Sequence, residues 1–161
     1  MKNIVLKLEN VSVGYGSKEI VSAINASINS NELIAVLGKN GAGKSTLINS
    51  ILGFQKTLNG EIYLENNSIK KLSSQEIAQQ IAVVLPRLSI VPKIKVSELV
   101  AMGRLPYHKV LKKISEEEQN LIDEVLELVG ISNLANQFAN EISEGQLQLV
   151  MIARALCQDA K

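Results

Sequence analysis

Aromatic residues, cysteine and histidine are scarce in this chain of 161 residues. It has no tryptophan, one cysteine and one histidine, and aromatic side chains make up 3% of it. A single thiol, Cys157, cannot form an internal disulfide, and it lies in an apolar helical run, so we expect it to be buried and inert in a reducing compartment. Because one histidine and one cysteine are too few for a zinc site, we expect His108 to lie in a surface loop.

An excess of charge and a long apolar run are also absent. Seventeen basic and sixteen acidic residues leave a formal charge of +1, so the composition gives no sign of nucleic-acid binding. No stretch reaches the roughly 18 apolar residues that a membrane-spanning helix needs, and residues 1–10 lack the apolar run of a signal peptide. We therefore expect any contact with a membrane to be made through a partner.

The spacing of the apolar residues predicts an α/β fold. Residues 4–16 and 19–30 alternate between apolar and polar side chains, which is typical of antiparallel strands. Residues 32–38 and 81–86 are short continuous apolar runs, as in strands buried on both faces of a parallel sheet. A helix is predicted over residues 43–52, with Gly53 at its end. Strand, helix and strand in this order indicate an α/β core.

Capping residues predict the remaining elements. Ser73 with Glu76, and Ser115 with Glu118, form capping boxes that open helices. Ser97 is predicted to cap a third helix, and a last helix is predicted over residues 144–158. The strand that begins near residue 60 is predicted to turn at Asn66-Asn67. The helix after Ser115 has one apolar face, made of Leu121, Ile122, Val125, Leu126 and Val129.

Residues 38–46, which read GKNGAGKST, match the phosphate-binding pattern G-x-x-x-x-G-K-[ST]. Glycines in such a loop let backbone N–H groups surround a phosphate, and the N-terminus of the following helix attracts anions. Lys44 would reach the β and γ oxygens of ATP, and the hydroxyl of Ser45 would bind Mg²⁺. The predicted ATP-binding residues of this phosphate loop are Gly38, Lys39, Asn40, Gly41, Ala42, Gly43, Lys44, Ser45 and Thr46.

A second pattern, ISEGQ at residues 142–146, is by itself only a helix N-cap at Ser143 followed by an amphipathic helix. Together with the phosphate loop it resembles the signature LSGGQ of the ATP-binding cassette family. The resemblance implies that residues 143–146, here called the signature, contact the ATP of a partner subunit. Glu144 replaces a glycine, and we expect its side chain to point away from the γ-phosphate because like charges repel. The signature consists of Ser143, Glu144, Gly145 and Gln146.

The resemblance covers nearly the whole chain. Tyr15, in VGYG, matches the aromatic residue on which family members stack adenine, and an edge-strand tyrosine is the alternative interpretation of the same residue. The family implies a P-loop NTPase core with an N-terminal antiparallel β subdomain, an inserted helical subdomain and, here, an incomplete parallel sheet. Residues 1–96 would hold the β subdomain and the start of the core, residues 97–140 the helical subdomain, and residues 141–161 the signature helix.

Two further segments bear on the subfamily. Residues 98–109, ELVAMGRLPYHK, are similar to a segment of importers for iron–siderophore, haem and cobalamin complexes, where the helical subdomain meets the membrane subunit. A helix end at Gly103 followed by a loop at Pro106 explains the same residues locally. Arg87 stands where the family places a glutamine near Mg²⁺, and a guanidinium cannot bind a cation, so we assign Arg87 no role.

The family carries its catalytic elements on an apolar strand ending in Asp-Glu, which no part of this sequence matches. We therefore expect a partial cassette that ends before this strand, and we assign no catalytic residue. In the family topology, later strands lie between residues 32–38 and 81–86. Without them, these two segments would leave backbone groups unpaired.

The sequence leads to one main hypothesis and two alternatives. The main one is the ATP-binding subunit of an ABC importer for iron-chelate or cobalamin-like solutes, an ATPase when complete. It would use ATP and Mg²⁺ and form a homodimer. Polytopic permease subunits would hold it at the cytoplasmic face of the membrane, and we expect no nucleic-acid partner. The alternatives are a non-catalytic nucleotide-binding fragment and a soluble cassette protein outside transport.

Overall fold

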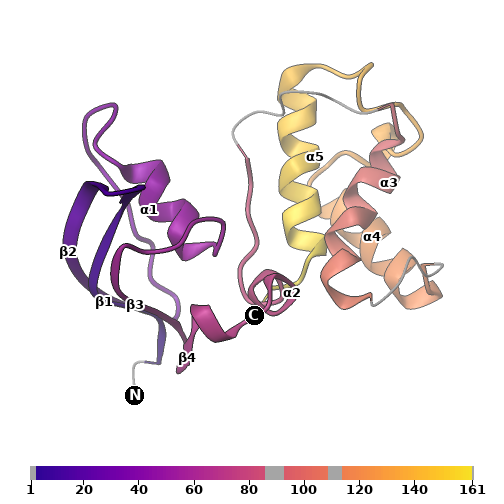
Figure 1. The fold of residues 1–161 in the computed structure, drawn as a ribbon. Helices are drawn as coiled ribbons and strands as arrows, with labels where there is room; N and C mark the ends of the chain where they lie inside the picture. The colour runs from indigo at the N-terminus through magenta and orange to yellow at the C-terminus, as the bar shows by residue number, and fades with distance from the viewer. Residues whose placement is uncertain (1–2, 86–92, 109–113, 161) are drawn as a thin grey trace. The chain divides into compact units, whose positions relative to one another are not determined.

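The computed structural model describes residues 3–85, 93–108 and 114–160. They fall into two compact units, residues 1–77 and 78–161 (Figure 1). The first unit holds the phosphate loop and the second holds the signature. Arg87 lies outside the described residues.

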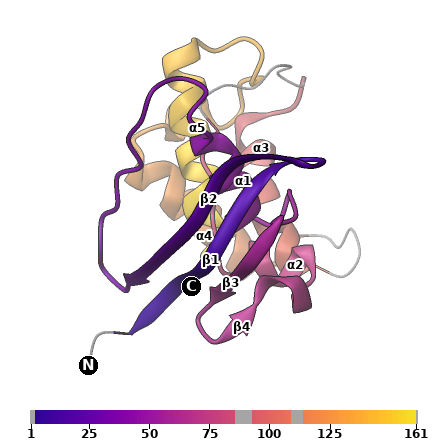
Figure 2. The ribbon, with the colours of Figure 1, turned by 60° about the vertical axis from the view of Figure 1, so that its left-hand side comes forward.

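The first unit is built on an antiparallel sheet of four strands in the order β2-β1-β3-β4. The two long strands β1 (Ile4–Tyr15) and β2 (Lys18–Asn29) form a hairpin, as predicted, and β3 (Asn59–Leu64) pairs with the other edge of β1 (Figure 2). The short β4 (Asn67–Ser68) pairs with β3. The buried apolar side chains of this unit are Leu8, Val11, Val13, Ile62, Leu64, Ile69 and Ile77.

Three helical segments complete the first unit. Helix α1 (Lys44–Ile51) follows the phosphate loop and contacts β1. The helix predicted over 43–52 is thus confirmed, and Gly53 after it has a positive φ of 73°. The 3₁₀ helix η1 (Ile69–Lys71) precedes α2 (Ser74–Ala78), whose capping box of Ser73 and Glu76 is confirmed by reciprocal hydrogen bonds.

Residues 32–38 and 81–85 are not strands, so the prediction of buried parallel strands is wrong for the described part of the chain. The side chain of Leu33 is 100% exposed and that of Leu37 is 88% exposed. A strand of a parallel sheet needs a hydrogen-bonded neighbour and cover on both faces. No described residue pairs with either segment, so their apolar pattern is not enough to make them strands.

The second unit is helical. Helix α3 (Val96–Ala101) continues into the 3₁₀ helix η2 (Met102–Tyr107), and α4 (Glu116–Leu128), η3 (Ser132–Leu134) and α5 (Glu144–Cys157) follow. Helix α5 packs along α3 and α4 (Figure 1). Of the helices in the described residues, none is long and apolar enough to cross a membrane. The buried core of this unit consists of Val96, Leu99, Val100, Ile122, Val125, Leu126, Ile131, Leu134, Ala139, Val150, Ala153 and Cys157.

Local predictions in the second unit are mostly confirmed. Ser115 accepts a hydrogen bond from the Glu118 amide and caps α4, which ends before Gly130 at a φ of 75°. The prediction for Ser97 is wrong, because α3 already begins at Val96. The Lys95 amide donates to the Glu98 carboxylate over 2.9 Å, which closes the first turn without a serine cap.

The predicted turn between β3 and β4 is displaced by one residue. Leu64 pairs with Asn67, so the turn is made by Glu65 and Asn66 rather than by Asn66 and Asn67. Glu65 takes the left-handed conformation, with a φ of 52°.

Candidate functional site

The phosphate loop leads directly into the N-terminus of α1. Gly41 and Gly43 have φ values of 80° and 90°, a backbone conformation that is costly for residues with a Cβ. The Lys44 ammonium donates to the carbonyl oxygens of Gly38 and Lys39 over 2.8 and 2.9 Å. This places a positive charge at the loop beside the free N–H groups of the first helical turn, where both attract anions.

Gly43 also lies tightly against β2. A Cβ on this residue would come within 2.3 Å of Val21 Cγ2 and 2.8 Å of Ile20 Cγ2. Either distance is shorter than atoms in contact allow, so glycine is required by the neighbouring strand as well as by its own φ.

A cavity of about 370 Å³ lies at this end of α1. One wall is apolar, contributed by β2, and the rest comes from the phosphate loop and the first turn of α1. The residues that line it are Ile20, Asn40, Gly41, Gly43, Lys44, Ser45 and Thr46. Ser45 is exposed, whereas Thr46 is buried, with 6% of its surface exposed. Ile20 was missed at the sequence level, because nothing in the β2 pattern distinguishes it from other apolar strand residues.

Tyr15 stands at the end of β1, where it pairs with Lys18 across the hairpin. Its side chain is 60% exposed and is not among the residues that line the cavity. An exposed aromatic face of this kind is available for stacking with a flat ring.

The signature forms the first turn of α5 in the second unit. The Ser143 hydroxyl accepts a hydrogen bond from the Gln146 amide over 3.3 Å, and the Gln146 side chain accepts one from the Ser143 amide over 2.9 Å. This is a capping box, S-x-x-Q, where the residue pattern had predicted only a serine N-cap. Gly145 is exposed, and a Cβ there would meet nothing within 4 Å. The predicted helix over 144–158 is confirmed as Glu144–Cys157.

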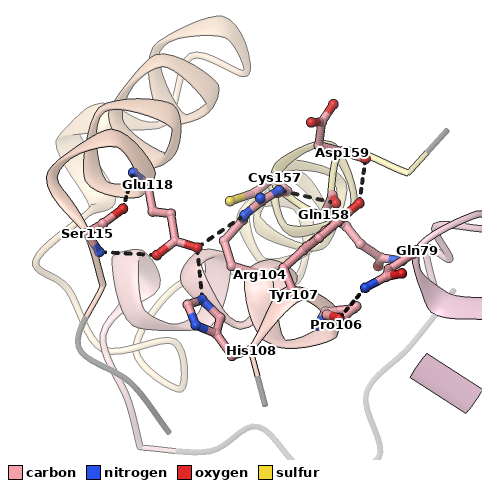
Figure 3. Close-up of polar contacts among 10 residues, drawn as sticks. All are labelled: Gln79, Arg104, Pro106, Tyr107, His108, Ser115, Glu118, Cys157, Gln158 and Asp159. Atoms are coloured by element: carbon pink, nitrogen blue, oxygen red, sulfur yellow. Dashed lines mark hydrogen bonds and ion pairs between the residues drawn. The ribbon is translucent and has the colours of Figure 1, made fainter. Parts of the chain in front are cut away.

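Two predictions about single side chains have different outcomes. Cys157 is fully buried, as expected, and burial raises the pKa of its thiol. His108 lies outside helices and strands, as predicted for a loop residue, but its side chain is only 17% exposed and its Nε2 lies 2.8 Å from a Glu118 oxygen (Figure 3). No group of metal-binding side chains occurs in the described ranges.

Comparison with known proteins covers both units. Residues 21–161 match the family model described as ABC transporter. The chain is 38% identical over 157 residues to an uncharacterized ABC transporter ATP-binding protein of Methanocaldococcus jannaschii, covering 98% of this chain and 54% of the relative. It is 34% identical over 155 residues to the probable siderophore transport system ATP-binding protein YusV of Bacillus subtilis, covering 96% of this chain and 56% of that protein.

The fold matches solved structures as well. The crystal structure of an ATP-binding cassette from an ABC transporter in its ADP conformation superposes with a TM-score of 0.83 at 31% identity, covering 98% of this chain and 66% of that one. The predicted α/β cassette fold with an antiparallel β subdomain is thereby confirmed. The chain spans about half the length of the two curated relatives named above. From the matched residues, the identities and the shared fold, we conclude that the chain belongs to the ABC transporter family, as a part of its ATP-binding domain.

Proposed function

We propose that this chain binds ATP with Mg²⁺ at the phosphate loop and forms part of the ATP-binding subunit of an importer for iron-chelate or cobalamin-like solutes. The observation that carries the proposal is the cavity at the N-terminus of α1, beside the Lys44 ammonium. The likeness to a siderophore transport protein supports the class of solute.

The groups around the cavity suit a nucleotide triphosphate. Backbone N–H groups of the phosphate loop would hold the β-phosphate, and Lys44 would exchange its carbonyl partners for the β and γ oxygens. The exposed Ser45 hydroxyl would bind Mg²⁺, which supplies charge neutralisation to the phosphates when bound. Tyr15 would stack on adenine, and Ile20 would give an apolar wall beside the sugar.

The signature would act on the nucleotide of a second copy of the subunit. Ser143 and the Gly145 amide lie in the first turn of α5, where an anion is favoured. In this arrangement two copies enclose ATP between the phosphate loop of one and the signature of the other. The pair would attach to permease subunits at the cytoplasmic face of the membrane.

A second candidate, binding of ATP without hydrolysis by this chain, has its own support. None of the described residues that line the cavity carries a carboxylate, the group that would act as base on an attacking water. The two candidates share the nucleotide site and differ in turnover.

Titration of the purified chain with Mg-ATP in a calorimeter tests the common claim. We expect Lys44→Ala to weaken binding by about tenfold or more, because a charge-assisted contact to phosphate is lost. Lys71→Ala, which removes an equal charge from an exposed position of η1 in the same unit, is the matched control and should bind like the original. Equal affinities for all three proteins would refute the proposed site.

Phosphate release in the same samples separates the two candidates. Turnover that disappears in Lys44→Ala supports an ATPase, and binding with no turnover supports the non-catalytic candidate. The importer part of the proposal is tested separately, by co-purification with the membrane subunits encoded beside the gene.

A further inference from the structure

A cluster of side chains joins η2 to the end of α5 in residues 78–161 (Figure 3). Arg104 Nη1 donates to the carbonyl oxygens of Cys157 over 3.1 Å and Gln158 over 3.4 Å. Its guanidinium lies 4.2 Å from the centre of the Tyr107 ring, and the Tyr107 hydroxyl donates to the Asp159 carbonyl over 2.8 Å. Arg104 thus binds carbonyls that the end of α5 leaves without helical partners, and Tyr107 binds the carbonyl of the residue that follows the helix cap.

A carboxylate from α4 forms an ion pair with the arginine. Glu118 Oε1 lies 3.7 Å from Arg104 Nε and 2.8 Å from His108 Nε2, and the other Glu118 oxygen accepts the Ser115 amide over 3.1 Å. The Arg104 and Glu118 side chains are 14% and 16% exposed, so water screens their charges weakly. The carboxylate that caps α4 therefore also lies in an ion pair with the residue that caps α5.

The backbones of η2 and α5 are in close contact as well. Gly103 is buried, and a Cβ on it would come within 2.4 Å of the Arg154 carbonyl oxygen and 3.0 Å of the Gln158 amide nitrogen. Any larger residue would push the two elements apart, so this contact brings Arg104 within reach of the helix end.

The end of α5 also holds the first residues of the unit. The Gln158 side chain donates to the carbonyls of Ala78 and Ile81, the latter over 2.9 Å. The Gln79 side chain donates to the Pro106 carbonyl over 2.7 Å. Hydrogen bonds therefore connect each of three segments to the other two: residues 78–81, η2 and the end of α5.

Helix α5 connects this cluster to the signature. Its 14 residues span about 21 Å at 1.5 Å per residue, with Ser143 at one end and Cys157 at the other. The 3₁₀ helix η2, which carries Arg104, also exposes the apolar side chains of Met102 and Leu105, at 45% and 50%.

We propose that Arg104 is a positioning residue that clamps η2 to α5. A displacement of α5 when Ser143 meets a nucleotide would then move η2, with its exposed Met102 and Leu105, as one body. This inference rests on the proposed function of the signature, whereas the clamp itself rests on the contacts around Arg104.

Amide hydrogen exchange of the nucleotide-free chain tests the clamp. Arg104→Met keeps an unbranched apolar stem and removes the guanidinium with its hydrogen bonds, and we expect about tenfold faster exchange at residues 102–108 and 157–160 together. The matched control is Arg154→Met, which removes an equal charge from the last turn of α5. This variant should leave the amide exchange of residues 102–108 unchanged. Unchanged exchange in Arg104→Met would show that the clamp does not exist.

The same measurement with Mg-ATP, at a protein concentration that allows two copies to meet, tests the coupling. In the original chain we expect slower exchange at residues 143–147 and also at 102–108. In Arg104→Met the effect at 143–147 should remain and the effect at 102–108 should disappear. Protection of 143–147 without 102–108 in the original chain, or protection of both in the variant, would overturn the coupling.

Two further outcomes keep the tests separate. If Mg-ATP protects neither residues 38–46 nor 143–147, the proposed function fails and the coupling with it, while the nucleotide-free comparison still decides the clamp. If Arg104→Met does not fold, Tyr107→Phe removes a single oxygen and its bond to the Asp159 carbonyl. We then expect amide exchange at residues 157–160 to speed up by less than tenfold, and unchanged exchange there would count against the clamp.

Discussion

Glu118 contacts more polar groups than a capping box requires. The pKa of its carboxyl lies below the usual value of 4.5. The largest cause is the hydrogen bond from the Ser115 amide, and the neighbouring His108 and Arg104 also lower the pKa, whereas desolvation raises it. A lowered pKa in the folded state stabilises the fold while the carboxyl is ionised. The stabilisation is complete above the unfolded pKa and is lost as the pH falls through the folded value.

Glu118→Gln should therefore lower the stability of residues 78–161 in a pH-dependent way. We expect a loss of about 1–2 kcal/mol at neutral pH, from weakened charge-assisted hydrogen bonds. The loss should shrink steadily as the pH falls below about 4.5. Urea denaturation at several pH values measures it, and Glu127→Gln on the exposed side of α4 gives the general effect of removing one carboxylate. A loss that is the same at every pH would contradict the prediction.

Helix α4 and the segment at residues 32–38 differ in what surrounds them. Both have strong apolar patterns, but α4 buries Ile122, Val125 and Leu126 against its neighbours, whereas Leu33 and Leu37 are exposed. A helix satisfies its backbone hydrogen bonds internally, and a strand needs another strand to do so. The helix therefore forms as its sequence indicates, and the strand does not.

Two substitutions within α4 measure how far packing stabilises it. Ile122 is 1% exposed and Leu128 is 76% exposed. We expect Ile122→Ala to destabilise the helical unit by about 2–5 kcal/mol through the cavity it leaves, and Leu128→Ala to cost less than about 0.5 kcal/mol. Chemical denaturation followed by circular dichroism gives both values. Similar costs for the two variants would mean that the core around Ile122 is not packed as described.

At the scale of the whole molecule, the residues that the structure describes form two buried cores. One lies in the β unit around Val11, Val13 and Ile62, and the other lies among α3, α4 and α5. A domain with its own core can in principle fold by itself. The cavity beside the phosphate loop belongs to the first unit and the Arg104 cluster to the second.

Each unit should accordingly respond to mutations in its own core. We expect Ile62→Ala, at a side chain with 0% exposure, to speed amide exchange in β1 and β3 by about tenfold or more and to leave α4 and α5 unchanged. The reverse should hold for Ile122→Ala. Exchange that rises throughout the chain in either variant would show instead that the two units unfold together.

Much of the candidate site could be predicted from the sequence because its groups act through the backbone or by residue type. The phosphate loop needs glycines, a lysine and a helix start within nine consecutive residues, and capping boxes need two residues three apart. Ile20, the ion pair that partly covers His108 and the start of α3 at Val96 could not be predicted in this way. Each depends on a residue distant in the sequence: Gly43, Glu118 and residues 135–137, respectively.

The sequence by itself determined the helices, the antiparallel hairpin and the phosphate loop, because local hydrogen bonds and short-range patterns specify them. The tertiary structure alone decided that residues 32–38 and 81–85 form no strands, and that Arg104 caps the last turn of α5 from 53 residues away. Such pairings depend on which surfaces the folded chain brings together, and residue spacing along the chain does not encode that.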